Sequence, residues 1–175
     1  TLKKLSFGVG ATGYTLALQD IGGADANLNS GWGYNTLDGY IYGVKSGKDE
    51  LWRIDGRGEF TLMSKLPNGA ADGTVSGDIL PNGVMIYPEN ATTMQLLDIT
   101  SPAAPVDLGR LTLGSAISSV DMAYNPVDGM IYGVNGSTDR LFAFSANGGA
   151  PGTVTVTEFG PAIYAGTFGA VWFDE

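Results

Sequence analysis

The chain has 175 residues, of which 43% are hydrophobic, and its net charge is −9 from 9 Lys and Arg against 18 Asp and Glu. This length and composition indicate one globular domain spanning residues 1–175, and the acidic balance argues against nucleic acid as a partner. Cysteine and histidine are absent, which excludes disulfides, thiolate nucleophiles, Cys/His zinc sites and imidazole-based catalytic triads.

The first expected elements are two strands, at residues 2–7 and 13–20, followed by an acidic loop. The loop holds Asp20, Asp25 and Asn27, whose oxygens are of the kind that Ca²⁺ binds, about six to eight at a time. These three residues form the predicted metal site, and Ca²⁺ is the only cofactor that the residues suggest. Further acidic candidates are Asp49 with Glu50 and Asp72 with Asp78, although none has the regular spacing of a calcium loop.

The next segment introduces an internal repeat. Residues 34–44 (YNTLDGYIYGV) and 124–134 (YNPVDGMIYGV) are near copies, and residues 80–88 (LPNGVMIYP) have the same outline. Their shared glycines, Gly39, Gly83 and Gly129, give a period of about 45 residues, which is typical of a β-propeller with one four-stranded blade per repeat. The Asp-Gly and Asn-Gly pairs at these glycines predict two-residue type I′ hairpin turns.

The repeat places three complete four-stranded blades at about residues 31–65, 74–112 and 117–160. Aromatic residues recur at matching positions of the first strand and of the second strand of several repeats, and we expect these to pack between blades. The first-strand set is Tyr34, Tyr124 and Trp172, and the second-strand set is Tyr42, Tyr87 and Tyr132. Strands are expected at 32–34, 40–44, 50–54 and 59–64, at 74–79, 84–87, 93–99 and 106–111, and at 118–124, 130–134, 140–144 and 153–159.

The two ends of the chain form a partial fourth blade. Residues 2–21 align with the last two strands of a repeat, and residues 166–174 align with a first strand. Either these ends join and close a ring of four blades, or the chain belongs to a larger ring completed by the remainder of a longer polypeptide or by a partner strand. The start at Thr1 without Met favours a processed product or a piece of a longer chain.

These repeats carry a family resemblance. Residues 124–134, with 141–144 (LFAF) and 169–174 (GAVWFD), resemble an uncharacterised family of propeller-like domains in large secreted or surface-anchored bacterial proteins. Residues 94–106 (MQLLDITSPAAPV) are similar to one LVIVD repeat, a propeller blade of bacterial and archaeal surface proteins. The resemblance implies an all-β propeller, secreted or at the cell surface. No window has the roughly 18 apolar residues that a membrane span needs, so we expect no membrane insertion.

Trp52 lies away from the repeated aromatic positions, which makes it the candidate for stacking on a glycan or peptide ligand. Repetition without distinctive polar residues favours a non-enzymatic, extracellular module of a bacterial surface or adhesin-like protein, acting as a scaffold or binding a protein or glycan. One alternative is a carbohydrate-active enzyme that uses two loop carboxylates. Another is an assembly subunit in which a partner strand completes the open blade.

Overall fold

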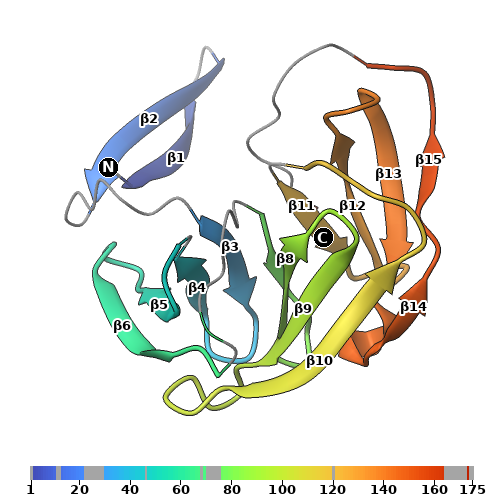
Figure 1. Cartoon of the computed structure of the whole chain (residues 1–175). Coiled ribbons are helices and arrows are strands. Elements are labelled where there is room, and N and C mark those ends of the chain that lie inside the picture. Colours follow the sequence, from blue (N-terminus) through green and yellow to red (C-terminus); the bar gives the residue numbers. More distant parts are fainter. Residues whose placement is uncertain are drawn as a thin grey trace.

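The computed structural model describes residues 2–10, 13–21, 30–45, 47–67, 69, 76–119, 121–163 and 173. In these ranges the chain is built from strands, grouped into one hairpin and three larger sheets (Figure 1). Among the described residues no helix is long and apolar enough to cross a membrane. The one helical turn described is a short 3₁₀ turn, Asn147–Gly149.

Each larger sheet begins with a strand near the middle of the molecule and continues outward in chain order (Figure 1). Aliphatic residues, methionine and aromatic residues make up about half of these strands, and turn residues separate them, as expected for antiparallel meanders. The first sheet contains β3 (Ser30–Asn35), β4 (Tyr40–Lys45), β5 (Glu50–Ile54) and β6 (Phe60–Lys65). The second contains β7 (Asp78–Ile79), β8 (Val84–Asn90), β9 (Thr93–Asp98) and β10 (Val106–Leu113), and the third contains β11 (Met122–Asn125), β12 (Met130–Asn135), β13 (Arg140–Ser145) and β15 (Thr157–Phe159).

The last strand of the third repeat differs from the prediction. The sequence predicts one strand over 153–159, but the structure divides this segment between two sheets. β14 (Gly152–Val154) pairs in parallel with β10 of the second sheet, whereas β15 pairs antiparallel with β13. Val154 also accepts a hydrogen bond of 2.8 Å from the backbone N–H of Gly114. The segment therefore connects two neighbouring sheets by backbone hydrogen bonds.

The hairpin turns of the repeat are not of type I′. A type I′ turn needs positive φ at both central residues, but only the glycines adopt it, with φ of 76° at Gly39 and 75° at Gly129. The loops are four residues long, because Asn35 pairs with Tyr40 and accepts a hydrogen bond from the backbone N–H of Gly39. The prediction of two-residue turns is therefore wrong, and the aspartate in each four-residue loop accepts hydrogen bonds with its side chain.

The aspartate side chain accepts equivalent hydrogen bonds in both copies of the motif. Asp38 accepts the backbone N–H of Tyr40 at 3.1 Å and the hydroxyl of Tyr42 at 2.7 Å. In the third repeat, Asp128 accepts the hydroxyl of Tyr132 at 2.6 Å. The repeated Asp-Gly-x-Ile-Tyr segment is thus a turn fastened to its own strand, which supports a structural role for the motif.

Two apolar cores lie between the sheets. One joins the first and second sheets, with Tyr42, Val44 and Leu51 packed against Met85 and Leu97. The other joins the second and third sheets, and its members include Ile86, Met94, Leu96, Leu111, Met122, Ile131, Phe142 and Phe144. Face-to-face packing of successive sheets is the arrangement expected of propeller blades.

The repeated aromatic residues differ in how deeply they are buried. Tyr42 and Tyr87 are buried, as predicted. Tyr34 is 56% exposed, so its predicted burial is wrong, and Tyr124 and Tyr132 are half-buried. Tyr34 lies on the face of the first sheet opposite to the second, where no neighbouring sheet is described. Trp172 lies outside the described residues.

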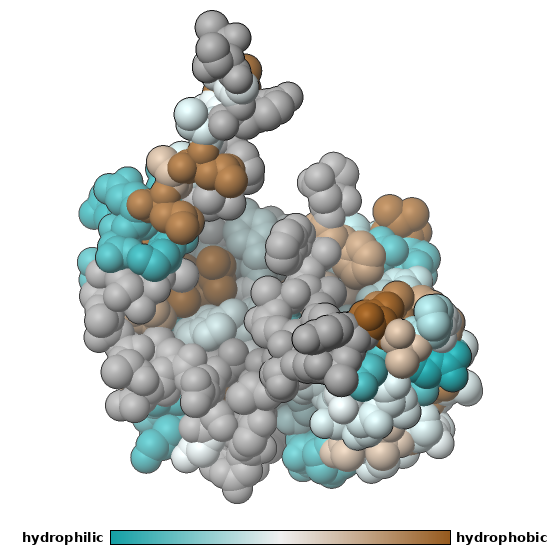
Figure 2. All heavy atoms as spheres, turned by 90° about the horizontal axis from the view of Figure 1, so that it is seen from above, coloured by the Kyte–Doolittle hydropathy of each residue, from teal (hydrophilic) through white to brown (hydrophobic). Residues whose placement is uncertain are grey.

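The amino-terminal strands form a separate antiparallel hairpin, β1 (Leu2–Gly10) with β2 (Gly13–Ile21). The hairpin stands out from the rest of the molecule, and hydrophobic side chains lie along it (Figure 2). Residues 166–172 and 174, which the sequence places beside this hairpin as a first strand, lie outside the described residues. The split blade therefore stays a prediction.

Candidate functional site

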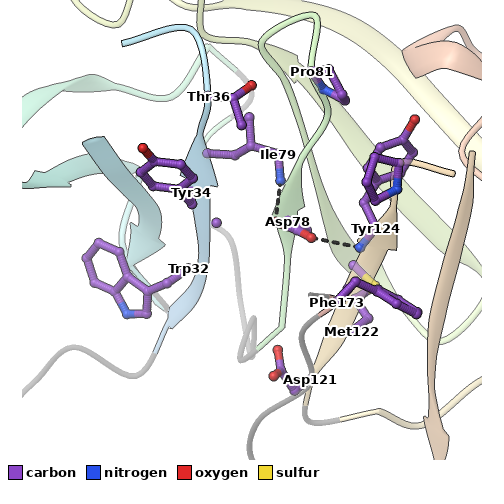
Figure 3. Close-up of a pocket in the computed structure, with 13 residues that line it drawn as sticks. Trp32, Tyr34, Thr36, Asp78, Ile79, Pro81, Asp121, Met122, Tyr124 and Phe173 are labelled. Atoms are coloured by element: carbon purple, nitrogen blue, oxygen red, sulfur yellow. Dashed lines mark hydrogen bonds between the residues drawn. The ribbon is translucent and has the colours of Figure 1, made fainter. Parts of the chain in front are cut away.

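A cavity of about 280 Å³ lies where the first strands of the three sheets, β3, β7 and β11, come together. In a propeller the first strand of each blade is the innermost, so the cavity occupies the position of the central channel. Its described lining combines two carboxylates, from Asp78 and Asp121, with tyrosine and phenylalanine rings (Figure 3).

Asp78 holds the junction of two sheets. Its carboxylate accepts the backbone N–H of Ile79 at 2.8 Å and, across the sheet boundary, that of Tyr124 at 2.7 Å (Figure 3). Burial raises the pKa of Asp78 to about 6, and the nearby charge of Asp121 acts in the same direction, while the two N–H donors oppose the shift. The carboxyl group of Asp78 therefore changes its protonation state close to neutral pH.

Asp78 also departs from the repeat. By strand pairing, Asp78 lies opposite Ile86, and the equivalent first-strand residues are Gly33 opposite Tyr42 and Ala123 opposite Tyr132. A carboxylate thus replaces a small residue at an inward position. Burying an ionisable group costs free energy that a structural repeat does not require, so this departure favours a specific function.

Gly33 shows why small residues otherwise occupy this position. A Cβ atom added to Gly33 would lie 2.7 Å from the backbone nitrogen of Ile79. The backbones of β3 and β7 therefore approach each other too closely for any side chain at Gly33. This approach helps to set the width of the cavity.

Aromatic residues form much of the remaining wall. Tyr34 and Tyr124 occupy the same position in β3 and β11, and both line the cavity. Phe173 also lines it, and its ring meets that of Tyr132 edge to face at a centroid distance of 5.3 Å. Two of these residues, Tyr34 and Tyr124, were predicted from the repeat to serve only as core.

Of the three predicted metal residues, the structure describes Asp20 alone. Asp20 lies at the end of β2, where it is hydrogen-bonded and ion-paired with Lys3 on β1, and this pairing lowers the pKa of Asp20. Asp25, Asn27 and Asp72 lie outside the described residues, so the calcium site stays a prediction. Within the described ranges, no group of three or more acidic residues is placed to hold a metal ion. Asp49 and Glu50 are ion-paired with Lys65.

Trp52 is half-buried on β5 and is not among the described lining residues of the cavity. Its indole N–H donates a hydrogen bond of 3.0 Å to Glu50, and the ammonium group of Lys45 lies 5.4 Å from the ring centroid. These contacts fix the ring in place and leave its role in stacking a prediction.

The sequence contains a signal for the cavity that motif searching missed. Local motifs present Asp78 as one of several acidic candidates, and they do not mark Asp121 or Tyr124 as site residues. The useful signal was the contrast between copies, because Asp78 stands where the other repeats have Gly33 and Ala123. This contrast appears only after the repeats are aligned by strand pairing. The turn at Gly83 has three residues where the first copy has four, so the first strand of the second copy is shifted by one residue.

Comparison with protein families gives one match, to a model described as "Repeat of unknown function (DUF6923)", over residues 3–174. A comparison with curated proteins finds no match.

Several solved structures share the fold. Virginiamycin B lyase from Staphylococcus aureus matches with a TM-score of 0.52 and 10% identity, over 92% of this chain and 50% of that one. A functionally unknown protein from Desulfotomaculum acetoxidans matches with a TM-score of 0.54 and 11% identity, over 89% of this chain and 53% of that one. An auxiliary nutrient binding protein from Bacteroides ovatus matches with a TM-score of 0.56 and 11% identity, over 86% and 35%.

At these identities the similarity shows the fold alone, and the chain spans about half of the length of the virginiamycin B lyase that it matches. The predicted all-β, propeller-like repeat and its resemblance to an uncharacterised repeat family are confirmed. The number of blades stays a prediction.

Proposed function

We propose, for a chain that belongs to the DUF6923 family of repeats, a non-enzymatic binding scaffold that takes a small ligand in the cavity between β3, β7 and β11. The observation that carries this proposal is Asp78, a mostly buried carboxylate at an inward position where the other repeats have a glycine and an alanine. Ligand pockets typically combine apolar and aromatic walls with a few polar groups, and this cavity has that composition.

We further propose that the chain is an extracellular module of a bacterial surface or adhesin-like protein. The net charge of −9 and the absence of cysteine are compatible with a secreted or surface location. Limited proteolysis of intact cells that produce the protein tests this. We expect the domain to be degraded while cytoplasmic markers survive, and protection equal to that of the markers would contradict the surface location.

Known structures support this proposal only through their shared fold. One protein with this fold is described as an auxiliary nutrient binding protein and another as a lyase, so the fold serves both kinds of activity. For the enzyme alternative, Asp78 and Asp121 are the carboxylates that share one cavity. We favour binding because both oxygens of Asp78 accept backbone N–H groups, which gives the carboxylate a structural partner on each side.

A ligand screen tests the cavity against its rival, the Trp52 surface. The protein is applied to glycan and peptide arrays with and without calcium, and hits are measured again with Phe173→Ala and Trp52→Ala. Phe173 lines the cavity and is 38% exposed, so it belongs to neither apolar core. We expect Phe173→Ala to weaken binding and Trp52→Ala to leave it unchanged. The reverse pattern would move the site to β5, and release of glycan fragments would favour the enzyme.

A second candidate function, assembly, is favoured by the β1–β2 hairpin. Val9, Leu16 and Leu18 on this hairpin are 83%, 66% and 67% exposed. A two-stranded hairpin is marginally stable by itself, and three or more strands or a packed face are needed. Because the chain spans about half of a similar propeller-like structure, a second copy is the occupant that we propose for this apolar face.

A further inference from the structure

We infer that the cavity between β3, β7 and β11 binds a primary ammonium group carried on a short apolar stem. This inference rests on the proposed function, because it names the class of ligand for the same cavity.

The charge of the cavity is the first argument. Asp78 and Asp121 both line it, and none of the other described lining residues is lysine or arginine. The groups that act on the protonation of Asp78 are its burial, two backbone N–H donors and the second carboxylate, with no cation among them. A bound ammonium group would supply the positive charge that favours the ionised form of a buried carboxylate.

The hydrogen-bonding capacity of Asp78 is the second argument. An ionised carboxylate offers about four lone-pair positions. The two backbone N–H groups of Ile79 and Tyr124 occupy one on each oxygen, at 2.8 and 2.7 Å. The remaining acceptor capacity suits an ammonium group, which brings three N–H donors. The backbone contacts also hold the carboxylate in place before the ligand arrives.

The apolar part of the wall and the size of the cavity define the rest of the ligand. Tyr124 and Phe173 contribute aromatic rings, which attract cations and pack against alkyl chains. The volume of about 280 Å³ is slightly below the range of about 300–1,000 Å³ usual for pockets that take drug-sized ligands. A small amine fits this volume, as does the end of a lysine side chain.

Calcium fits the cavity less well. Ca²⁺ takes about six to eight oxygen ligands, several of them usually carboxylates, whereas the described lining offers two carboxylates, from Asp78 and Asp121. The described residues also contain no cluster of three or more acidic side chains. An organic cation needs fewer oxygen contacts because aromatic faces supply part of its stabilisation.

The test uses the whole chain and four probes measured by titration calorimetry and by NMR. The four probes are n-butylammonium chloride, 1-butanol, sodium butanoate and calcium chloride. In a separate, fifth titration, Nα-acetyl-lysine amide represents a lysine side chain of a peptide. At pH 7.5 we expect n-butylammonium to bind at least about tenfold more tightly than 1-butanol, and butanoate not to bind. Binding of the lysine derivative would indicate a peptide ligand, and its exclusion a free amine, both in agreement with the inference.

Two variants and a pH series make the test specific. Asp78→Asn removes the charge and should abolish the preference for ammonium over alcohol. Asp139→Asn is the matched control, because Asp139 has a φ of 55°, which asparagine tolerates, and does not line the cavity. In the unmutated protein the affinity for n-butylammonium should fall as the pH decreases through about 6, where Asp78 takes up a proton. This last measurement does not depend on the folding of a variant.

The outcomes separate the inference from the proposed function. Equal binding of 1-butanol and n-butylammonium would overturn the ammonium inference and leave a neutral binding cavity. Calcium binding that Asp78→Asn removes, without ammonium binding, would overturn it in favour of a metal site. If no probe binds but an array ligand requires Phe173, the inference fails and the binding function stands. If no array ligand is found either, both fail.

Discussion

At the scale of single residues, Asp78 is the group whose ionisation should be visible in the stability of the whole domain. Its pKa is raised to about 6 in the folded protein, above the value of about 3.9 in an unfolded chain. The folded state therefore holds the proton more tightly, so the stabilisation is fully present below about pH 4 and is lost as the pH rises through 6. The ionised group costs at most about 3 kcal/mol at pH 7.

The prediction concerns Asp78→Asn. The free energy of unfolding of the variant should equal that of the unmutated protein near pH 4 and exceed it increasingly towards pH 7. Urea denaturation at a series of pH values measures the difference, in which the contributions of other carboxylates cancel. A constant difference across this range would show that the carboxylate is ionised in the folded state at every pH, against the expected effect of its burial.

The tyrosines that follow each turn give a second prediction at this scale. Tyr42 is buried and donates its hydroxyl to Asp38, and both burial and this hydrogen bond raise its pKa above the ordinary value. Tyr42→Phe should cost about 1 kcal/mol, the usual net worth of a hydrogen bond, somewhat more when the acceptor is charged. Tyr132→Phe is the comparison, because Tyr132 makes the same bond but is half-buried. Thermal and urea denaturation should show the smaller loss for Tyr132→Phe, and equal losses would show that burial does not strengthen the bond.

At the scale of elements, the closeness of β3 and β7 defines the cavity wall. Gly33→Ala places a Cβ atom 2.7 Å from the backbone nitrogen of Ile79, and a backbone atom cannot move aside as a side chain can. We expect a loss of about 1–3 kcal/mol, as for other overpacked sites. Gly56→Ala is the control, because a Cβ atom there meets nothing within 4 Å. Chemical denaturation compares the two, and an equally small effect at both positions would mean that the strands can separate freely.

Most elements could be predicted from the sequence because each depends on neighbours in the chain. The strands around Gly39, Gly83 and Gly129 follow from local alternation and turn residues. The division of 153–159 could not be predicted, because β14 finds its partner in β10, about forty residues earlier and in another sheet. The turn type was also missed, since the side chain of Asp38 bonds to a tyrosine four residues on, and an Asp-Gly pair by itself does not reveal this.

The cavity was less predictable than the sheets for a related reason. Asp78 and Tyr124 come together only when the second and third sheets pack, and 46 positions separate them in the chain. A motif search examines residues close in sequence and therefore favoured loops such as that of Asp20. The comparison of equivalent positions in the repeats is the local observation that would have selected Asp78.

At the scale of the whole molecule, the open question is what covers the β1–β2 hairpin. The cross-strand register places Val9, Leu16 and Leu18 on one face of the hairpin, and all three side chains are exposed. The ion pair of Lys3 with Asp20 lies at the end of the same face, and the pair of Lys4 with Gln19 lies on the other. Among the described residues no third strand pairs with this hairpin. A two-stranded hairpin with exposed apolar side chains is suited to pairing with another sheet, as it would be in a ring made from two copies.

The last prediction follows from this geometry. In size-exclusion chromatography with light scattering the protein should form a dimer, because an exposed apolar face of this kind is rarely left open on a monomer. Leu18→Gln should shift the equilibrium to monomer, since it places a polar amide in the proposed contact. Val127→Gln is the matched control, because Val127 is 91% exposed on the turn between β11 and β12, away from the hairpin. A monomer at every concentration, or equal effects of the two variants, would rule out the second copy as the occupant of this face.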